Sequence, residues 1–137
     1  MQTTTNTESA VESVLDGPTL SAHQRAVRDI PVSRHVTGFA VDLARATRPH
    51  EQGVPAFVHE QVGWGAGPRA SQALILAAKT HAALNGRLNV SCNDVRHVAL
   101  PVLRHRIQAS FSAEAEGITT DSIVTQLLQT VHERTNA

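Results

Sequence analysis

The chain has 137 residues, of which 41 % are hydrophobic, with no tyrosine, one tryptophan and a formal net charge of zero when histidines are neutral. This length supports one domain with its own core but excludes a nucleotide-binding α/β core joined to a second domain, and the scarcity of aromatic residues favours closely packed helices. The balanced charge gives no long-range attraction to phosphate backbones, so we expect no nucleic-acid partner.

Residues 1–18 are rich in threonine, serine and acidic residues and lack sustained periodicity, so they predict a flexible tail or linker. The helical domain is expected over residues 19–137. The apolar residues Leu20, Val27 and Ile30 predict a first helix. Pro31 closes it, because proline disfavours helical geometry in the residue before it.

Ser33 is placed to cap a second helix, which Pro49 ends and whose apolar stripe comprises Val36, Phe39, Ala40, Leu43 and Ala44. Prolines and glycines in residues 48–67 predict a long irregular connection, with at most a short extended piece around Phe57 and Val58. Connections of this length in a small domain are usually functional or flexible.

The third predicted helix runs from Pro68 to Asn85 and is apolar on almost every side, so we expect it to be central and buried. Gly67 is an acceptable N-cap, and Gly86 is the expected left-handed terminator. In this register Arg69 lies on the first turn, where backbone N–H groups lack intrahelical partners and the helix dipole is positive. Together with its guanidinium they make a candidate phosphate site, the alternative being an ordinary solvated arginine.

Ser91 and Asp94 have the spacing of a capping box, and an apolar stripe follows them: Val95, Val98, Ala99, Val102, Leu103 and Ile107. Pro101 interrupts this stripe, so we expect a kink or two consecutive helices. After a turn at residues 116–117, Thr119 or Thr120 caps a last helix. The expected fold is all-α, a bundle of about five helices with a long irregular connection between the second and third.

The segment Gly65-Ala66-Gly67-Pro68-Arg69-Ala70 resembles the lid domain of the MoxR family of AAA+ ATPases, in which a Gly-Ala-Ser-Pro-Arg-Ala-type segment carries the sensor 2 arginine. Further matches lie along the chain in the family's order: Ile30-Pro31-Val32-Ser33, Ala46-Thr47-Arg48-Pro49, Gly86-Arg87, Asn93-Asp94-Val95 and Val102-Leu103-Arg104-His105-Arg106. The likeness spans roughly Leu20 to the C-terminus. Gly67 departs from the family's usual serine, and the lost hydroxyl cap costs about a few tenths of a kcal/mol.

The resemblance implies a lid that closes over ATP and magnesium held mainly by a separate AAA+ core, with residues 1–18 as the linker from that core. Arg69 would reach the terminal phosphate, with Gly67 and Pro68 at the helix start, and loss of this phosphate would let the lid rotate. The resemblance also implies ring oligomers, contacts with neighbouring subunits, partners containing von Willebrand factor A domains, and chaperone-like remodelling or metal-insertion work.

The sequence contains no P-loop, since Lys79 is isolated within a helix, and no acidic strand end that could carry magnesium. We therefore expect the isolated chain to be inactive, as a fragment of an ATPase. A small independent enzyme would need paired carboxylates or a triad-like group, and the sequence offers neither.

No metal site is expected, because no histidine pair has the helical i, i+4 spacing with a carboxylate and Cys92 has no cysteine companion. Cys92 and His97 fall on different faces of a helix, which disfavours a nucleophilic pair. His81 is expected to be partly buried and hydrogen-bonded to a neighbouring element. With no disulfide, no membrane-length apolar run and no signal-peptide pattern, the chain is expected to be cytoplasmic.

Arg48 and the run Arg104-His105-Arg106 are candidates for contacts with a neighbouring domain or subunit. For this run the alternatives are a nucleic-acid patch and a solvated helix end, where cations are favoured. The alternative function is a freestanding helical binding module, a helix-turn-helix DNA reader that uses residues 91–107. The neutral charge and Pro101 within the candidate recognition helix argue against it.

Overall fold

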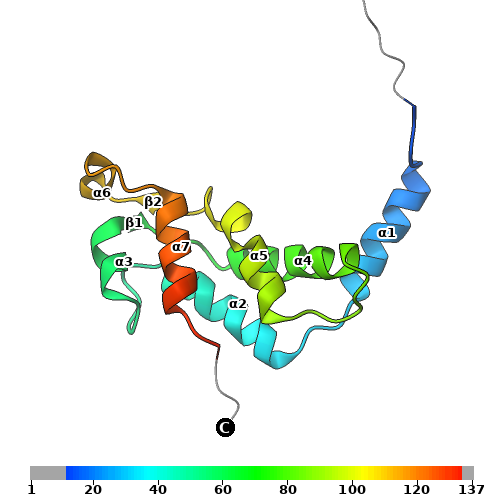
Figure 1. Cartoon of the computed structure of the whole chain (residues 1–137), viewed down its shortest axis with the longest axis horizontal. Helices are drawn as coiled ribbons and strands as arrows, with labels where there is room; N and C mark the ends of the chain where they lie inside the picture. The colour runs from blue at the N-terminus through cyan, green and yellow to red at the C-terminus, as the bar shows by residue number, and fades with distance from the viewer. Residues whose placement is uncertain (1–11, 134–137) are drawn as a thin grey trace, which may run out of the picture.

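The computed structural model describes residues 12–133, and it is all-α as predicted, apart from one pair of very short strands (Figure 1). The elements in chain order are α1 (Gly17–Asp29), α2 (Arg34–Ala46), α3 (Ala56–Gln61), β1 (Val62–Trp64), α4 (Arg69–Leu84), α5 (Cys92–Leu103), β2 (Gln108–Ala109), α6 (Phe111–Ala115) and α7 (Thr120–Thr130). The five longer helices correspond to the five predicted ones. No helix in the described part of the chain is long and apolar enough to cross a bilayer.

Side-chain caps fix where several helices begin. The Asp16 carboxylate accepts a hydrogen bond from the Thr19 N–H at 2.8 Å, so α1 begins at Gly17, two residues before the predicted start. Ser33 caps α2 and Thr119 caps α7, both as predicted. Residues 1–11 of the expected tail lie outside the described residues.

The core lies where α4 packs against α5 and α2, with α7 crossing both of the latter and α1 resting on α4 (Figure 1). Its largest fully buried side chains include Phe39, Leu43, Leu74, Leu103, Ile123 and Leu127. The small residues Ala70, Ala78 and Ala82 on the buried face of α4 allow the neighbouring helices to approach closely. The single core therefore needs few aromatic side chains.

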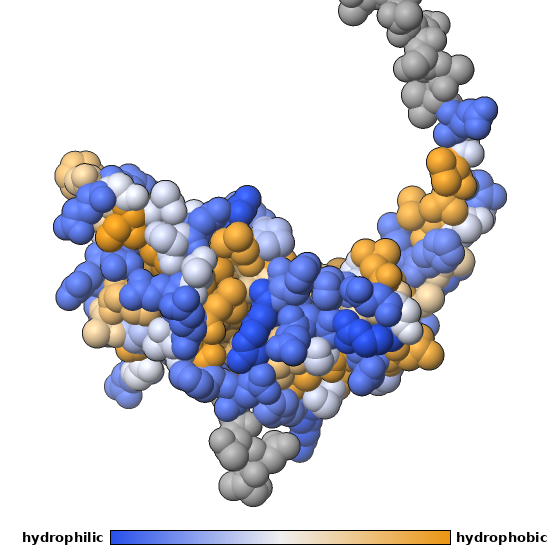
Figure 2. Space-filling view, viewed as in Figure 1, coloured by the Kyte–Doolittle hydropathy of each residue, from blue (hydrophilic) through white to orange (hydrophobic). Residues whose placement is uncertain are grey.

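α4 is the central helix, as predicted, but it is buried on one face only. Leu76 and Leu84 are exposed, because α1 covers only part of the outer face of α4 and has no buried residue of its own. Figure 2 shows apolar surface along α1. Leu20 of α1, Leu84 and Leu88 line neighbouring apolar grooves between the two helices.

The prediction of an irregular connection between α2 and α4 is wrong in its second half, where α3 and β1 form. Val62 pairs with Ala109 and Trp64 with Gln108 in an antiparallel ladder with an irregular register at Gly63. The buried side chain of Val58 anchors α3 to the core. The two-stranded sheet of β1 and β2 and the helix α3 lie beside α7, at the end of the molecule opposite α1 (Figure 1).

Pro101 does not divide α5 into two helices, because the helix continues through it to Leu103. Within a helix, proline removes the hydrogen bond that its own N–H would donate, and its ring crowds the carbonyl four residues earlier. Since Pro101 lies in the last turn, few bonds follow it, and the Arg104 N–H still donates to the Leu100 carbonyl at 3.0 Å.

Candidate functional site

Two hydrogen bonds hold the segment between β1 and α4 against the end of α2, one through the N–H of Ala66 and one through its carbonyl. The Ala66 N–H donates to Thr47 Oγ1 at 2.8 Å, and Arg48 Nε donates to the Ala66 carbonyl at 2.8 Å. The Thr47 hydroxyl in turn donates to the Ala44 carbonyl at 2.7 Å, and its side chain is fully buried. Both polar groups of Ala66 are therefore paired, and the segment is held in one position.

Gly65 is required by the same contact. A Cβ atom at this position would lie 2.4 Å from the Thr47 carbonyl oxygen and 2.7 Å from the Arg48 Cα. Both are backbone atoms, so no side-chain rotation could relieve the clash. The glycine lets the two chain segments touch backbone to backbone.

Arg48 uses two of its five N–H donors within this domain. Besides the Ala66 carbonyl it contacts Glu51 Oε1 at 3.1 Å, while Arg45 donates to the other oxygen of Glu51 at 2.8 Å. The hydrogen bond from Arg45, helped by Arg48, lowers the pKa of the Glu51 carboxyl. Arg48 is half-buried and positions the 65–67 segment, and its contact with a neighbouring domain or subunit stays a prediction.

Arg69 begins α4, is exposed as expected, and has no hydrogen-bond or ion-pair partner among residues 12–133. Gly67 and Pro68 before it are also exposed, and the Ala70 N–H donates to the Gly67 carbonyl at 2.9 Å. No side chain caps this helix, and its first turn contains no acidic residue. A cation beside the positive end of a helix is unfavourable by about 0.3–1 kcal/mol. An anion bound at Arg69 would remove this repulsion, so the position favours anion binding.

A recess of about 450 Å³ lies beside this helix start. Its lining includes Arg48, His50 and the run from Gly63 to Pro68. Trp64 forms part of its wall and is 73 % exposed, which is unusual for a large aromatic side chain. Trp64 was not predicted as a site residue, although this only tryptophan of the chain directly precedes Gly65.

The matches at Gly86-Arg87 and Asn93–Val95 have a structural explanation. Asp94 is 1 % exposed and accepts hydrogen bonds from both terminal nitrogens of Arg87, one of them at 2.8 Å. Ser91 donates to Asp94 through its N–H and its hydroxyl, completing the predicted capping box. The Arg87 guanidinium, above all, holds the pKa of the Asp94 carboxyl well below its usual range. This cluster links the end of α4 to the start of α5.

His81 belongs to the same cluster, as predicted for a partly buried histidine on the central helix. Its Nδ1 lies 2.7 Å from Asp94 Oδ1, and its ring stacks on His97 with centroids 4.1 Å apart. Gly86 adopts a left-handed φ of 68°, and the Arg87 N–H donates to the Ala82 carbonyl at 2.9 Å, which ends α4 as predicted.

Comparison with known proteins identifies the family. Residues 55–127, just over half of the chain, match the family described as AAA lid domain. The chain belongs to this family. The matched range contains the Gly65–Ala70 segment, the Arg87–Asp94 ion pair and the small two-stranded layer.

Individual relatives agree with the lid assignment. The lid is 37 % identical over 100 residues to "Chaperone MoxR1" of Mycobacterium tuberculosis, covering 73 % of this chain and 26 % of that protein. It is 30 % identical over 108 residues to "Uncharacterized protein YeaC" of Bacillus subtilis, covering 79 % and 31 %. The crystal structure of a "putative ATPase" from Cytophaga hutchinsonii matches with a TM-score of 0.75 and 32 % identity, over 81 % of this chain and 34 % of that one. The resemblance to the lid of a MoxR-like AAA+ ATPase is confirmed, and the chain spans about a quarter to a third of these relatives.

The run Arg104-His105-Arg106 follows α5 of the lid. Arg104 forms an exposed ion pair with Asp121 at 2.8 Å, linking the end of α5 to the start of α7. Arg106 donates to the Val102 carbonyl and touches the ring of His105. The guanidinium of Arg104 stays exposed in its ion pair. A contact of this run with a neighbouring subunit stays a prediction.

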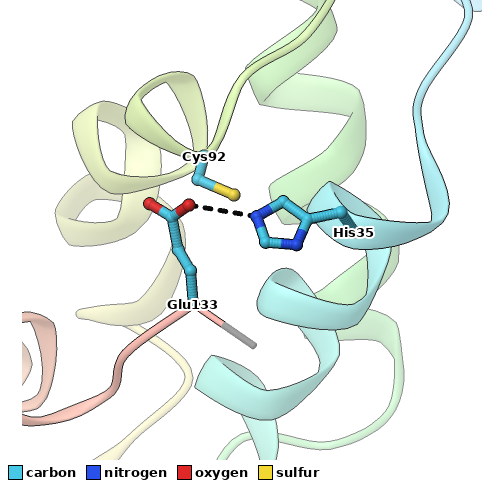
Figure 3. Close-up of side chains that lie close together, drawn as sticks. All are labelled: His35, Cys92 and Glu133. Atoms are coloured by element: carbon cyan, nitrogen blue, oxygen red, sulfur yellow. Dashed lines mark hydrogen bonds and ion pairs between the residues drawn. The ribbon is translucent and has the colours of Figure 1, made fainter. Parts of the chain in front are cut away.

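One side-chain cluster of the lid joins residues far apart in the sequence, which is why their spacing gave no signal. His35, Cys92 and Glu133 come from the starts of α2 and α5 and from the chain after α7 (Figure 3). His35 Nε2 lies 3.0 Å from Glu133 Oε2. Burial, and then the nearby Glu133, raise the pKa of the Cys92 thiol to about 11, while the hydrogen bond from His35 leads in lowering the pKa of Glu133.

Proposed function

We propose that this lid closes over ATP bound to the core of a MoxR-like AAA+ ATPase, and that Arg69 acts there as the sensor 2 arginine on the terminal phosphate. The observation that carries this proposal is the exposed, unpartnered guanidinium of Arg69 at an uncapped helix start. Phosphate oxygens would accept hydrogen bonds from its planar donors together with N–H groups at the start of the helix.

The rigid fastening of the preceding segment supports this role. Gly65 and Ala66 are fixed to Thr47 and Arg48, so the start of α4 does not need to be ordered when nucleotide arrives. Preorganised donors cost little reorganisation at the moment of phosphate transfer. The core would supply the P-loop, the magnesium ligands and most of the ATP contacts.

The proposed cycle is a lid movement controlled by the terminal phosphate. With the phosphate present, Arg69 holds the lid against the nucleotide, and after hydrolysis the lost contact lets the lid rotate. The apolar grooves between α1 and α4 supply a surface on which the lid could rest against the rest of the ATPase. In a cytoplasmic ring of such subunits, the movement would drive chaperone-like remodelling or metal insertion, with von Willebrand factor A domain proteins as partners.

The test uses a complete ATPase that carries this lid. We expect Arg69→Ala to lower kcat about 100-fold or more, because a charge-assisted bond to the phosphate is lost in the transition state. Arg69→Lys should restore only part of the rate, since lysine is a point charge without the donor fork. Thermal unfolding of the lid should be nearly unchanged, because no buried atom is removed.

Arg34 offers a matched control. It is also an exposed arginine at the first position of a helix, but Ser33 caps that helix. Arg34→Ala should leave turnover within about twofold, as for other exposed side chains away from a site. If Arg69→Ala and Arg34→Ala have equal, small effects on kcat, the sensor 2 assignment is wrong and the motif is structural only.

A further inference from the structure

Three metal-ligating side chains meet where the lid's C-terminal segment passes the starts of α2 and α5. His35, Cys92 and Glu133 each present one ligand atom, and these atoms all lie within 4.8 Å of one another. In Figure 3 the Cys92 sulfur points toward the space between the imidazole and the carboxylate. Three chain segments therefore converge on one point.

The chemistry of these groups matches zinc. Thiolate, imidazole and carboxylate are the three side-chain ligands that proteins use for Zn²⁺, and the sulfur disfavours Mg²⁺ and Ca²⁺. With metal–ligand bonds of about 2.0–2.3 Å, tetrahedral ligand atoms lie about 3.3–3.8 Å apart. Ligand atoms that lie up to 4.8 Å apart would therefore move inward, and His35 Nε2 and Glu133 Oε2, which are 3.0 Å apart, would separate slightly. We propose that His35, Cys92 and Glu133 bind Zn²⁺ with water as a fourth ligand, fastening the chain after α7 to the starts of α2 and α5.

The surroundings orient the carboxylate ligand. Arg96 donates to Glu133 Oε1 at 2.8 Å, leaving Oε2 directed at His35, and Arg96 is itself held over the ring of Phe39 at 4.5 Å. The second ring nitrogen of His35, Nδ1, is buried without a partner in the described residues, so the ring's hydrogen bond is made through Nε2 into the cluster. A group that holds a ligand from behind, as Arg96 holds Glu133, is typical of metal sites.

Charge and proton balance are satisfied by this assignment. Zn²⁺ replaces the thiol proton of Cys92, which is released to solvent, and the ring proton of His35 shifts from Nε2 to Nδ1 so that Nε2 can bind the ion; thiolate and carboxylate then balance the two charges of Zn²⁺ beside the Arg96 cation. Cys92 is 5 % exposed, and a neutral assembly suits such a position better than an isolated ion would. The site is independent of the nucleotide proposal, since none of its residues touches Arg69 or the recess beside it.

Cobalt titration of the 137-residue chain tests the site directly. Cys92 is the only cysteine, so a near-ultraviolet thiolate-to-cobalt charge-transfer band can come from this residue alone. We expect that band, with visible absorption of a tetrahedral ion, to saturate at one Co²⁺ per chain and to be displaced by Zn²⁺. Absence of the band, while the chain is folded, would overturn the proposal and leave a hydrogen-bonded cluster.

Variants separate the site from adventitious histidine binding. Cys92→Ser should abolish the band, and His35→Gln and Glu133→Gln should each weaken Co²⁺ binding at least tenfold. His59→Gln, which changes an exposed histidine outside the cluster, should leave binding unchanged. Zn²⁺ should also raise the melting temperature of the wild type but not of Glu133→Gln, a variant whose fold is checked by circular dichroism. Equal cobalt affinity in Glu133→Gln and wild type would overturn the three-ligand assignment.

Discussion

Gly65 and Gly67 are two residues apart in the motif and have opposite surroundings. A Cβ at Gly65 would overlap the Thr47 carbonyl, whereas nothing lies within 4 Å of a Cβ at Gly67. Only the first glycine is needed for packing. The second lies at the helix start and leaves the space around Arg69 open.

We expect Gly65→Ala to lower the free energy of unfolding by about 1–3 kcal/mol, because backbone must shift to admit the methyl group. Gly67→Ala, the matched control, should be neutral or slightly stabilising, since it restricts the unfolded chain without a clash. Urea denaturation followed by circular dichroism measures both. Equal losses in the two variants would mean that the contact with Thr47 is not what requires a glycine.

For single residues, the motif could be recognised from the sequence, but the different roles of Gly65 and Gly67 within it could not. The register of α4 was enough to predict that Arg69 is exposed, because a first-turn position after Gly-Pro points away from the core. The partners of Arg48 could not be predicted, since its contacts with Ala66 and Glu51 depend on how two distant segments meet. The same reason hid the grouping of His35, Cys92 and Glu133.

The link between α4 and α5 depends on one buried carboxylate. The Asp94 side chain is hydrogen-bonded to His81 of α4, to Arg87 in the turn and to Ser91 at the start of α5. These bonds hold the pKa of Asp94 well below its usual range in the folded chain. In the unfolded chain the pKa of the same carboxyl is about 3.9.

The stability that Asp94 supplies is therefore complete above about pH 5 and is lost as the pH falls through its lowered folded-state pKa. We expect the melting temperature to fall progressively from about pH 5 to about pH 2. Asp94→Asn should reduce this dependence and lower the free energy of unfolding at neutral pH by about 2–4 kcal/mol. Glu51→Gln is the control, because its carboxylate is more exposed. An unchanged pH profile in Asp94→Asn would contradict this account.

Element prediction succeeded where the sequence carried several turns of periodicity or a cap. The capping box at Ser91 and the terminator Gly86 are local signals, and both are correct. The short helices α3 and α6 were missed, since five or six residues hold too little of a helical period, although Ser110 caps α6. Their formation depends on tertiary contacts, such as the hydrogen bond from the Ser110 N–H to the Gln61 carbonyl at 2.8 Å.

For the whole molecule, the single continuous core predicts that the 137-residue chain folds without its AAA+ core. Circular dichroism should show a helical protein with one cooperative unfolding transition. The same preparation should not hydrolyse ATP, because the sequence lacks a P-loop and acidic magnesium ligands. Turnover that persists after removal of contaminating ATPases and disappears in Arg69→Ala would contradict this prediction.

The position of Trp64 also decides what intrinsic fluorescence can report. Since the only indole of the chain is 73 % exposed in the folded lid, its emission should already resemble that of a solvated tryptophan and should change little on unfolding. It lines the recess beside the start of α4, so anything that closes over that recess removes water from the ring. The fluorescence of Trp64 should therefore change when the recess is covered and should be a poor measure of unfolding of the core.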